Sequence, residues 1–465
     1  MNGSRLLVGL VLFALGACVL TVASGSTAVL AYMGDEPFSA AGLDLRNLRP
    51  VHETCAVAWT FLGGVAIVYL YLLARFGPLS AAERRRFACH LVLWVAAGIG
   101  IVATLLAGKT SGREYLGYHP AFSAMIFAGW LLFAWNFFSR QKPLLRGQPA
   151  HVYMWVAGIA VLVIAYAEGH LYLLDAVSDR PLRDMAIQWK SNGVLVGSFN
   201  QIVYGSLMYV SCRMKGDESY ARSRTAFALF AVGLLNTFAN YGHHTYHLPQ
   251  SPWIHWIAFS VSMLEVLILA KVFADLVALR KAAPPAADLA VPVAFARSAT
   301  LWTFLMLALA LAISVPPANA MIHGTHVVVA HSMGAMIGID AMILFAALGY
   351  LVRELAGTGH PAIRGKRVRL AVPLVNASLV VFWLALLARG LAAGWMRYAG
   401  PSSPDFSRIV QVFPYLFLVS GAVLASAIAW IDGCWAAALA PLLWGSRRTG
   451  EVREAVEEPA SRPGA

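Results

Sequence analysis

The chain has 465 residues, of which 59% are hydrophobic and 12% are charged, and its mean hydropathy is +0.67. This balance excludes a soluble globular domain. The formal net charge of +12 would suggest a nucleic-acid partner in a soluble protein, but here the basic residues gather in alternate connections between apolar segments. Because that distribution is the positive-inside pattern, it predicts a protein that lies in a lipid bilayer and binds no nucleic acid.

Apolar segments follow one another along almost the whole chain. Crossing the hydrocarbon core takes roughly 20 consecutive apolar residues, so we predict an all-α, polytopic membrane protein of about twelve transmembrane helices. In chain order, the predicted spans are residues 6–32, 50–74, 87–108, 119–139, 150–174, 190–212, 223–245, 252–279, 297–317, 325–352, 368–396 and 407–432. Residues 1–444 form one membrane domain in this prediction, and the polar residues 445–465 form a disordered cytoplasmic tail.

The basic connections predict an orientation. They contain Arg84-Arg85-Arg86, Arg140/Lys142/Arg146, Arg213/Lys215/Arg222/Arg224, Arg280/Lys281 and Arg364/Lys366/Arg367/Arg369. Every second connection is therefore expected in the cytoplasm, which places both termini there and the protein in a bacterial inner membrane. The five cysteines form no CxxC or CxxCH spacing, so the chain encodes no disulfide framework, zinc knuckle or covalently bound c-type haem.

Histidines are the strongest functional candidates inside the spans, because an ionisable group at membrane depth costs about 2.5–3.5 kcal/mol. They gather at His52, at His243-His244, and at His323, His326 and His331. For His52 alone, an interfacial residue that binds nothing is an equal alternative.

The adjacent pair His243-His244 ends the seventh predicted span. Neighbouring helical residues point about 100° apart, so both imidazoles can reach one metal ion at a helix terminus, and imidazole suits iron, copper or zinc. A histidine-rich connection that includes His247 and His255 is the structural alternative.

His331 and Met333 lie two residues apart on the tenth predicted span. They face opposite sides of a helix, about 200° apart, and cannot bind one ion. Histidine and methionine are both axial haem ligands, so this helix fits between two haems. Ordinary apolar packing is the alternative for Met333.

These residues resemble a family, the cbb-type cytochrome c oxidases and cytochrome-c-dependent nitric oxide reductases of the haem-copper oxidase superfamily. The segment Asn47-Leu48-Arg49-Pro50-Val51-His52 resembles the family's R-P-x-H motif. The resemblance implies a subunit I bundle in which His52 binds a low-spin haem b.

A loop motif of the family is also matched. The segment Gly112-Arg113-Glu114-Tyr115-Leu116 resembles G-[RK]-E-[YF]. The resemblance implies that Arg113 lies near the haem propionates and that Glu114 helps to bind calcium. Both roles agree with the chemistry of a guanidinium and of a carboxylate.

Two further segments resemble the family's metal and haem sites. Tyr241-Gly242-His243-His244 resembles the segment that gives two imidazoles to a non-haem iron or copper ion, and Glu265 then corresponds to the catalytic-site glutamate of the nitric oxide reductases. A structural ion pair with Lys271 is the alternative for Glu265. The run from His323-Gly324-Thr325 to His331-Ser332-Met333-Gly334-Ala335 resembles the tenth-helix motif, and it implies His331 as the ligand of a high-spin haem b.

The chain departs from this family pattern at two positions. Gly193 occupies the place of the first non-haem metal histidine, and neighbouring Asn192 offers only an amide. Met333 occupies the place of the second low-spin haem histidine, a change that should raise the reduction potential. The carboxylates expected on the sixth helix are also missing between Gly193 and Met208.

Two functions follow from the resemblance and these departures. The first is a terminal reductase of nitric oxide, or of oxygen, that takes electrons from a membrane-anchored cytochrome c subunit. The second is a non-reductase haem b paralogue that serves electron transfer, sensing or assembly.

Overall fold

A computed structural model describes residues 2–33, 44–111, 113, 115–141, 146–178, 192–239, 251–281, 286–399 and 410–444. Throughout these ranges all the regular structure is helical. Within the same ranges, ten helices are long and apolar enough to cross a membrane. The prediction of an all-α, polytopic membrane fold is therefore confirmed.

The principal helices follow the predicted spans in order. They are α1 (Gly3–Tyr32), α3 (Leu45–Phe76), α4 (Ala81–Leu106), α5 (Pro120–Gln141), α6 (Ala150–Glu168), η3 (Asn192–Asn200) continued by α9 (Gln201–Lys215), α10 (Arg224–Ala239), α11 (Pro252–Lys281), α12 (Ala290–Ser314), α14 (His326–Met333) continued by η7 (Gly334–Ala341) and α15 (Met342–Ala356), α17 (Lys366–Ala399), and α19 (Phe413–Leu439). The short helices are η2 (Leu171–Leu173), α7 (Asp175–Ser178), η4 (Tyr220–Arg222), η6 (Ala287–Leu289), α13 (Pro316–Ile322), α16 (Pro361–Arg364) and α20 (Pro441–Trp444).

Several predicted helix starts were late, and two of them have a clear physical reason. The second span begins at Leu45 rather than at residue 50, because the Asp44 side chain accepts the Asn47 backbone N–H at 3.0 Å and caps the helix one turn earlier. Helix α12 begins at Ala290 rather than at residue 297, and its first turns pack inside the bundle, where Val291, Phe295 and Ala296 are buried. The predicted tail, residues 445–465, lies outside the described residues.

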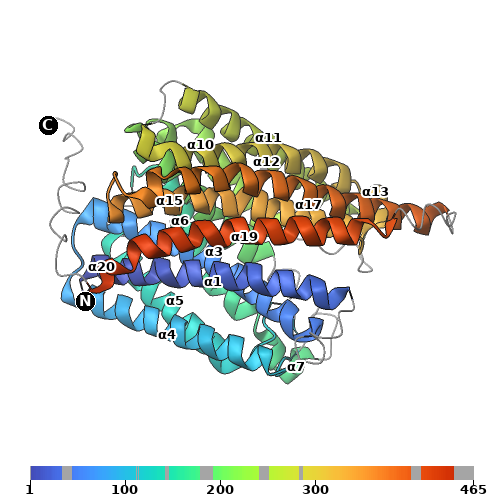
Figure 1. Cartoon of the computed structure of the whole chain (residues 1–465), viewed down its shortest axis with the longest axis horizontal. Helices are drawn as coiled ribbons and strands as arrows, with labels where there is room; N and C mark the ends of the chain where they lie inside the picture. The colour runs from blue at the N-terminus through green and yellow to red at the C-terminus, as the bar shows by residue number, and fades with distance from the viewer. Residues whose placement is uncertain are drawn as a thin grey trace.

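The helices run side by side in one bundle, with α1 beside α19 although the two are at opposite ends of the sequence (Figure 1). The start of α1 lies against the end of α3, because a Cβ built on Gly3 would come 3.4 Å from Leu73. We call this the terminal end of the bundle, where α20 also lies (Figure 1). The other end, which carries α7 and α13, is the opposite end (Figure 1).

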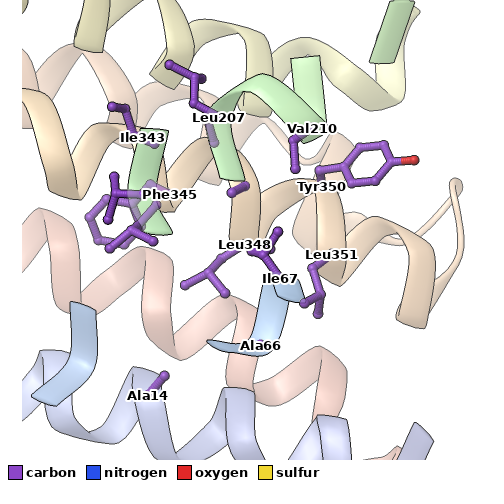
Figure 2. Close-up of a cluster of buried hydrophobic side chains, with 14 of the residues drawn as sticks. Ala14, Ala66, Ile67, Leu207, Val210, Ile343, Phe345, Leu348, Tyr350 and Leu351 are labelled. Carbon is purple, nitrogen blue, oxygen red and sulfur yellow. The ribbon is translucent and has the colours of Figure 1, made fainter. Parts of the chain in front are cut away.

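The centre of the bundle is made by helices that are apolar on every side. Residues 59–72 of α3 and 342–352 of α15 are buried all round, the pattern of a helix enclosed by other helices. Figure 2 shows Ile67 of α3 beside Leu348 of α15 in this core. Leu207 of α9 and Ala14 of α1 belong to the same buried cluster. This packed centre fixes the positions of the elements that carry the site.

At the terminal end, one arginine joins three helices. The Arg140 guanidinium of α5 donates to both Glu83 carboxylate oxygens, at 2.7 and 2.8 Å, and to the carbonyls of Gly77 and Pro78 at 2.9 and 2.7 Å. Glu83 also accepts the Ser80 backbone N–H in the capping box of α4. The polar groups of this partly buried cluster are therefore hydrogen-bonded to other groups of the chain, as buried polar groups in folded proteins usually are.

Candidate functional site

His52 lies near the start of α3, with its side chain against α1. Its Nδ1 atom is 2.8 Å from the Thr21 carbonyl oxygen. A carbonyl only accepts, so Nδ1 carries the hydrogen and Nε2 keeps its lone pair. Histidines that bind a metal through one ring nitrogen usually donate the N–H of the other nitrogen to a backbone carbonyl or a carboxylate, as His52 does here.

Met333 ends α14 and is half-buried. It packs on a small apolar cluster of α14, α17 and α19 that includes Phe417, and Val29 of α1 packs on the same cluster. Val29 lies one helical turn beyond Gly25, the residue that His52 touches. The fold thus brings His52 and Met333 toward the same end of α1, although the two are far apart in sequence.

His331 offers a second imidazole on α14. Its Nδ1 atom is buried and makes no hydrogen bond with any described residue. An unpaired buried polar atom costs about 1–3 kcal/mol, so the site suits a ligand that would bind there. Because His331 and Met333 are about 200° apart on the helix, they serve separate neighbours.

Arg113 is buried beside the end of α6. Its guanidinium lies 4.0 Å from the ring centroid of Tyr172 and donates to the Gly169 carbonyl at 3.2 Å. These contacts hold the arginine in one position at the opposite end of the bundle. The neighbouring Glu114 lies outside the described residues.

The predicted non-haem metal ligands fall mostly outside the described residues. This applies to His243, His244 and the side chain of Glu265, whose backbone belongs to α11. Over the described ranges, no three His, Cys, Asp or Glu side chains gather as a metal site. Gly193 is described and buried in η3, and it offers no side-chain ligand.

Two π-helical segments adjoin the predicted site residues, and sequence reasoning missed them. Segment η3 contains Gly193, and η7 begins directly after Met333. Each has glycines four residues apart, and a Cβ on Gly338 would meet the Trp302 ring at 2.5 Å. Such segments are frequent at functional sites, so the paired glycines were a usable signal.

Buried carboxylates were also missed. Asp340 of η7 and Asp432 of α19 are 5% and 1% exposed. Among the described residues, Asp340 Oδ1 has no hydrogen-bond partner, and the Cys18 thiol lies beside the Asp432 carboxyl. Each interrupts an apolar run in the sequence, the pattern by which intramembrane functional carboxylates are recognised.

Comparison with known proteins places these features in a family. Residues 5–424 match the family model described as Cytochrome C and Quinol oxidase polypeptide I. The chain belongs to this family. Among solved structures, a heme-copper terminal oxidase dimer studied by cryo-EM is similar, with a TM-score of 0.73, 16% sequence identity, and coverage of 94% of this chain and 84% of that chain. Among curated proteins, no match is found.

Family membership makes this oxidase subunit I relative a multi-pass membrane haem oxidoreductase of electron transport, and the family generally binds haems and a metal. The donor set fits that cofactor. His52 presents Nε2 with Nδ1 already bonded, and His331 has a buried nitrogen that no described residue pairs. Met333 has a thioether, and histidine and methionine are both types of axial haem ligand.

Proposed function

We propose that this protein is a nitric-oxide-reductase-like terminal reductase with an altered non-haem metal site. The observation that carries the proposal is the His52 imidazole, whose Nδ1 is held by a backbone carbonyl so that Nε2 is available to iron. The reaction would reduce nitric oxide, or oxygen, with electrons from a membrane-anchored cytochrome c subunit.

In this proposal the low-spin haem b is held by His52 and Met333. Their approach to the same stretch of α1 supports a shared ligand between them. The bound haem supplies one-electron transfer, and the two side chains set its potential. Arg113 would neutralise the propionates, a role that suits a guanidinium fixed by Tyr172.

His331 would bind the high-spin haem b, on the other side of α14 from Met333. Its unpaired Nδ1 supports a ligand role for this imidazole. His243, His244 and Glu265 would hold the non-haem iron or copper ion, and Glu114 a calcium ion. We favour nitric oxide over oxygen because Glu265 matches the reductase glutamate, whereas Gly193 removes one imidazole.

A second function is favoured by Gly193 itself. Because this buried position has no side chain, the three-imidazole site of the family is incomplete. A haem b paralogue without reductase activity, serving electron transfer, sensing or assembly, needs only the haem ligands.

We also propose that both termini face the cytoplasm of a bacterial inner membrane. Arg84, Arg85 and Arg86 begin α4 at the terminal end, where Arg140 also lies. Basic residues at that end support a cytoplasmic position. The cytochrome c donor would then approach from the opposite end, near His52.

A pyridine haemochrome assay with metal analysis of the purified protein tests the choice of function. Two b haems and one stoichiometric non-haem iron or copper ion, with nitric oxide consumption by reduced cytochrome c, are expected of the reductase. Haem without a second metal, and no consumption of nitric oxide or oxygen, would replace it with the paralogue. Absence of haem would refute both functions.

A further inference from the structure

Helix α1 touches His52 at two adjacent places on one face. Thr21 supplies the carbonyl that accepts Nδ1–H, and Gly25 lies one turn further along the helix. A Cβ built on Gly25 would come 2.7 Å from both Cε1 and Nδ1 of His52. No real Cβ tolerates that separation, so the imidazole occupies the space that a side chain at position 25 would fill.

Helix geometry explains why these two residues act together. In an α-helix each Cα–Cβ bond tilts toward the N-terminus, so a side chain at position 25 would cover the turn that contains Thr21. Glycine leaves that turn open to a side chain from a neighbouring helix. The Thr21 hydroxyl is turned away, since it donates to the Ala17 carbonyl at 2.8 Å.

We propose that α1 is the positioning element for the haem ligand: the Thr21 carbonyl fixes the tautomer of His52, and the missing side chain at Gly25 fixes the orientation of its ring. The inference rests on the proposed ligation of haem by His52. Thr21 and Gly25 act through His52 and are positioning residues.

The hydrogen bond has a consequence for electron transfer. An Nδ1–H that donates to a carbonyl makes the imidazole a more basic ligand. A more basic ligand favours ferric iron and lowers the midpoint potential, opposite to the effect of a methionine ligand. Thr21 and Met333 therefore tune the same haem in opposite directions.

The test is the variant Gly25→Ala, with Gly16→Ala as its matched control. Gly16 lies on the same helix, and a Cβ built there meets nothing within 4 Å. The clashing group at Gly25 is a side-chain ring that can turn, so we expect the variant to fold with its haem. Its low-spin ferric EPR signal should shift, and its preference for ferric iron should fall about tenfold, which raises the midpoint potential by about 59 mV.

Gly16→Ala should leave both the EPR signal and the potential unchanged. A Gly25→Ala protein that matches the control in both would overturn the inference. If Gly25→Ala does not accumulate, pulsed EPR of the unaltered protein gives the answer through the quadrupole coupling of the remote imidazole nitrogen. A coupling typical of a strongly hydrogen-bonded N–H is expected, and the coupling of a free N–H would overturn the inference.

His52→Ala separates this inference from the proposed function. Loss of the low-spin signal is expected if His52 binds haem. A retained signal would refute the ligation, and with it the positioning by α1. A lost signal in His52→Ala, together with a Gly25→Ala protein identical to Gly16→Ala, would refute the positioning alone.

Discussion

The Arg140–Glu83 cluster at the terminal end of the bundle and the histidines at the opposite end differ in their hydrogen bonding. At the terminal end, Arg140 and Glu83 bond to each other and to backbone carbonyls, and their side chains are each 11% exposed. At the opposite end, His52 has only its Nδ1 bonded to a backbone carbonyl, and His331 has a buried nitrogen without a partner in the part of the chain that the structure describes. Among the described residues, the Arg140–Glu83 cluster therefore completes its own hydrogen bonds, whereas the two histidines at the opposite end leave nitrogens for other partners.

The difference indicates separate roles for the Arg140–Glu83 cluster and for the two histidines. A polar cluster that completes its own hydrogen bonds joins helices and contributes to stability. A buried group that the chain leaves unsatisfied lowers stability until a ligand binds. Substitutions in the Arg140–Glu83 cluster should therefore change the free energy of unfolding without changing the haem. Substitutions of the proposed haem ligands should change the haem with little effect on the free energy of unfolding.

The largest effect is expected at Arg140. Arg140→Met leaves Glu83 without its cation and leaves the Gly77 and Pro78 carbonyls without their donor, so unfolding should become easier by about 3–5 kcal/mol. Unfolding in detergent, followed by helical circular dichroism, measures the loss. The double variant Arg140→Met/Glu83→Leu should recover part of it, because no unpaired charge remains. A single variant as stable as the unaltered protein would break the contrast between the ends.

A change at Met333 should act on the haem instead. Met333→His replaces a thioether by an imidazole, so the low-spin haem should remain while its midpoint potential falls, on the order of 100 mV. Spectroelectrochemical titration measures the shift. The free energy of unfolding of Met333→His should equal that of the unaltered protein. An unchanged haem spectrum and midpoint potential would show that Met333 only packs against its neighbours.

Ser80 gives a smaller effect at the terminal end. Its side chain caps α4 by accepting the Glu83 backbone N–H at 3.3 Å, and Ser80→Ala removes that bond. The expected cost is about 1 kcal/mol. The same unfolding assay measures it, and Ser80→Asp, which keeps a capping oxygen, serves as the control. Identical losses in both variants would mean that the cap contributes nothing.

The smallest effect concerns pH and the connection after α9. Hydrogen bonds from the Ser219 backbone N–H and hydroxyl, and from Lys215, hold the pKa of the Asp217 carboxyl below its usual value. The stabilisation by the ionised Asp217 carboxylate is therefore fully present above the usual pKa of an aspartate, and it is lost as the pH falls through the lowered pKa of Asp217. As the pH is lowered, the difference in melting temperature between the unaltered protein and Asp217→Asn should become smaller. A difference that does not vary with pH would contradict the assignment.

Much of the architecture follows from local sequence. In lipid, backbone groups must bond within their own segment, so each apolar run of sufficient length becomes a helix wherever it packs. This is why the predicted spans coincide with helices and why the motifs around His52 and His331 lie on helices. The predicted roles of His243, His244, Glu265 and Glu114 concern side chains outside the described residues, and they stay predictions.

Tertiary structure alone decided which groups meet. No local sequence pattern pairs Arg140 with Glu83, or Thr21 with His52. Arg140 of α5 reaches Glu83 of α4 because these helices pack together with the end of α3. Thr21 of α1 reaches His52 because α1 packs against the start of α3. Helix formation in a membrane depends on neighbours four residues away, whereas the tautomer and direction of a ligand depend on a helix elsewhere in the sequence.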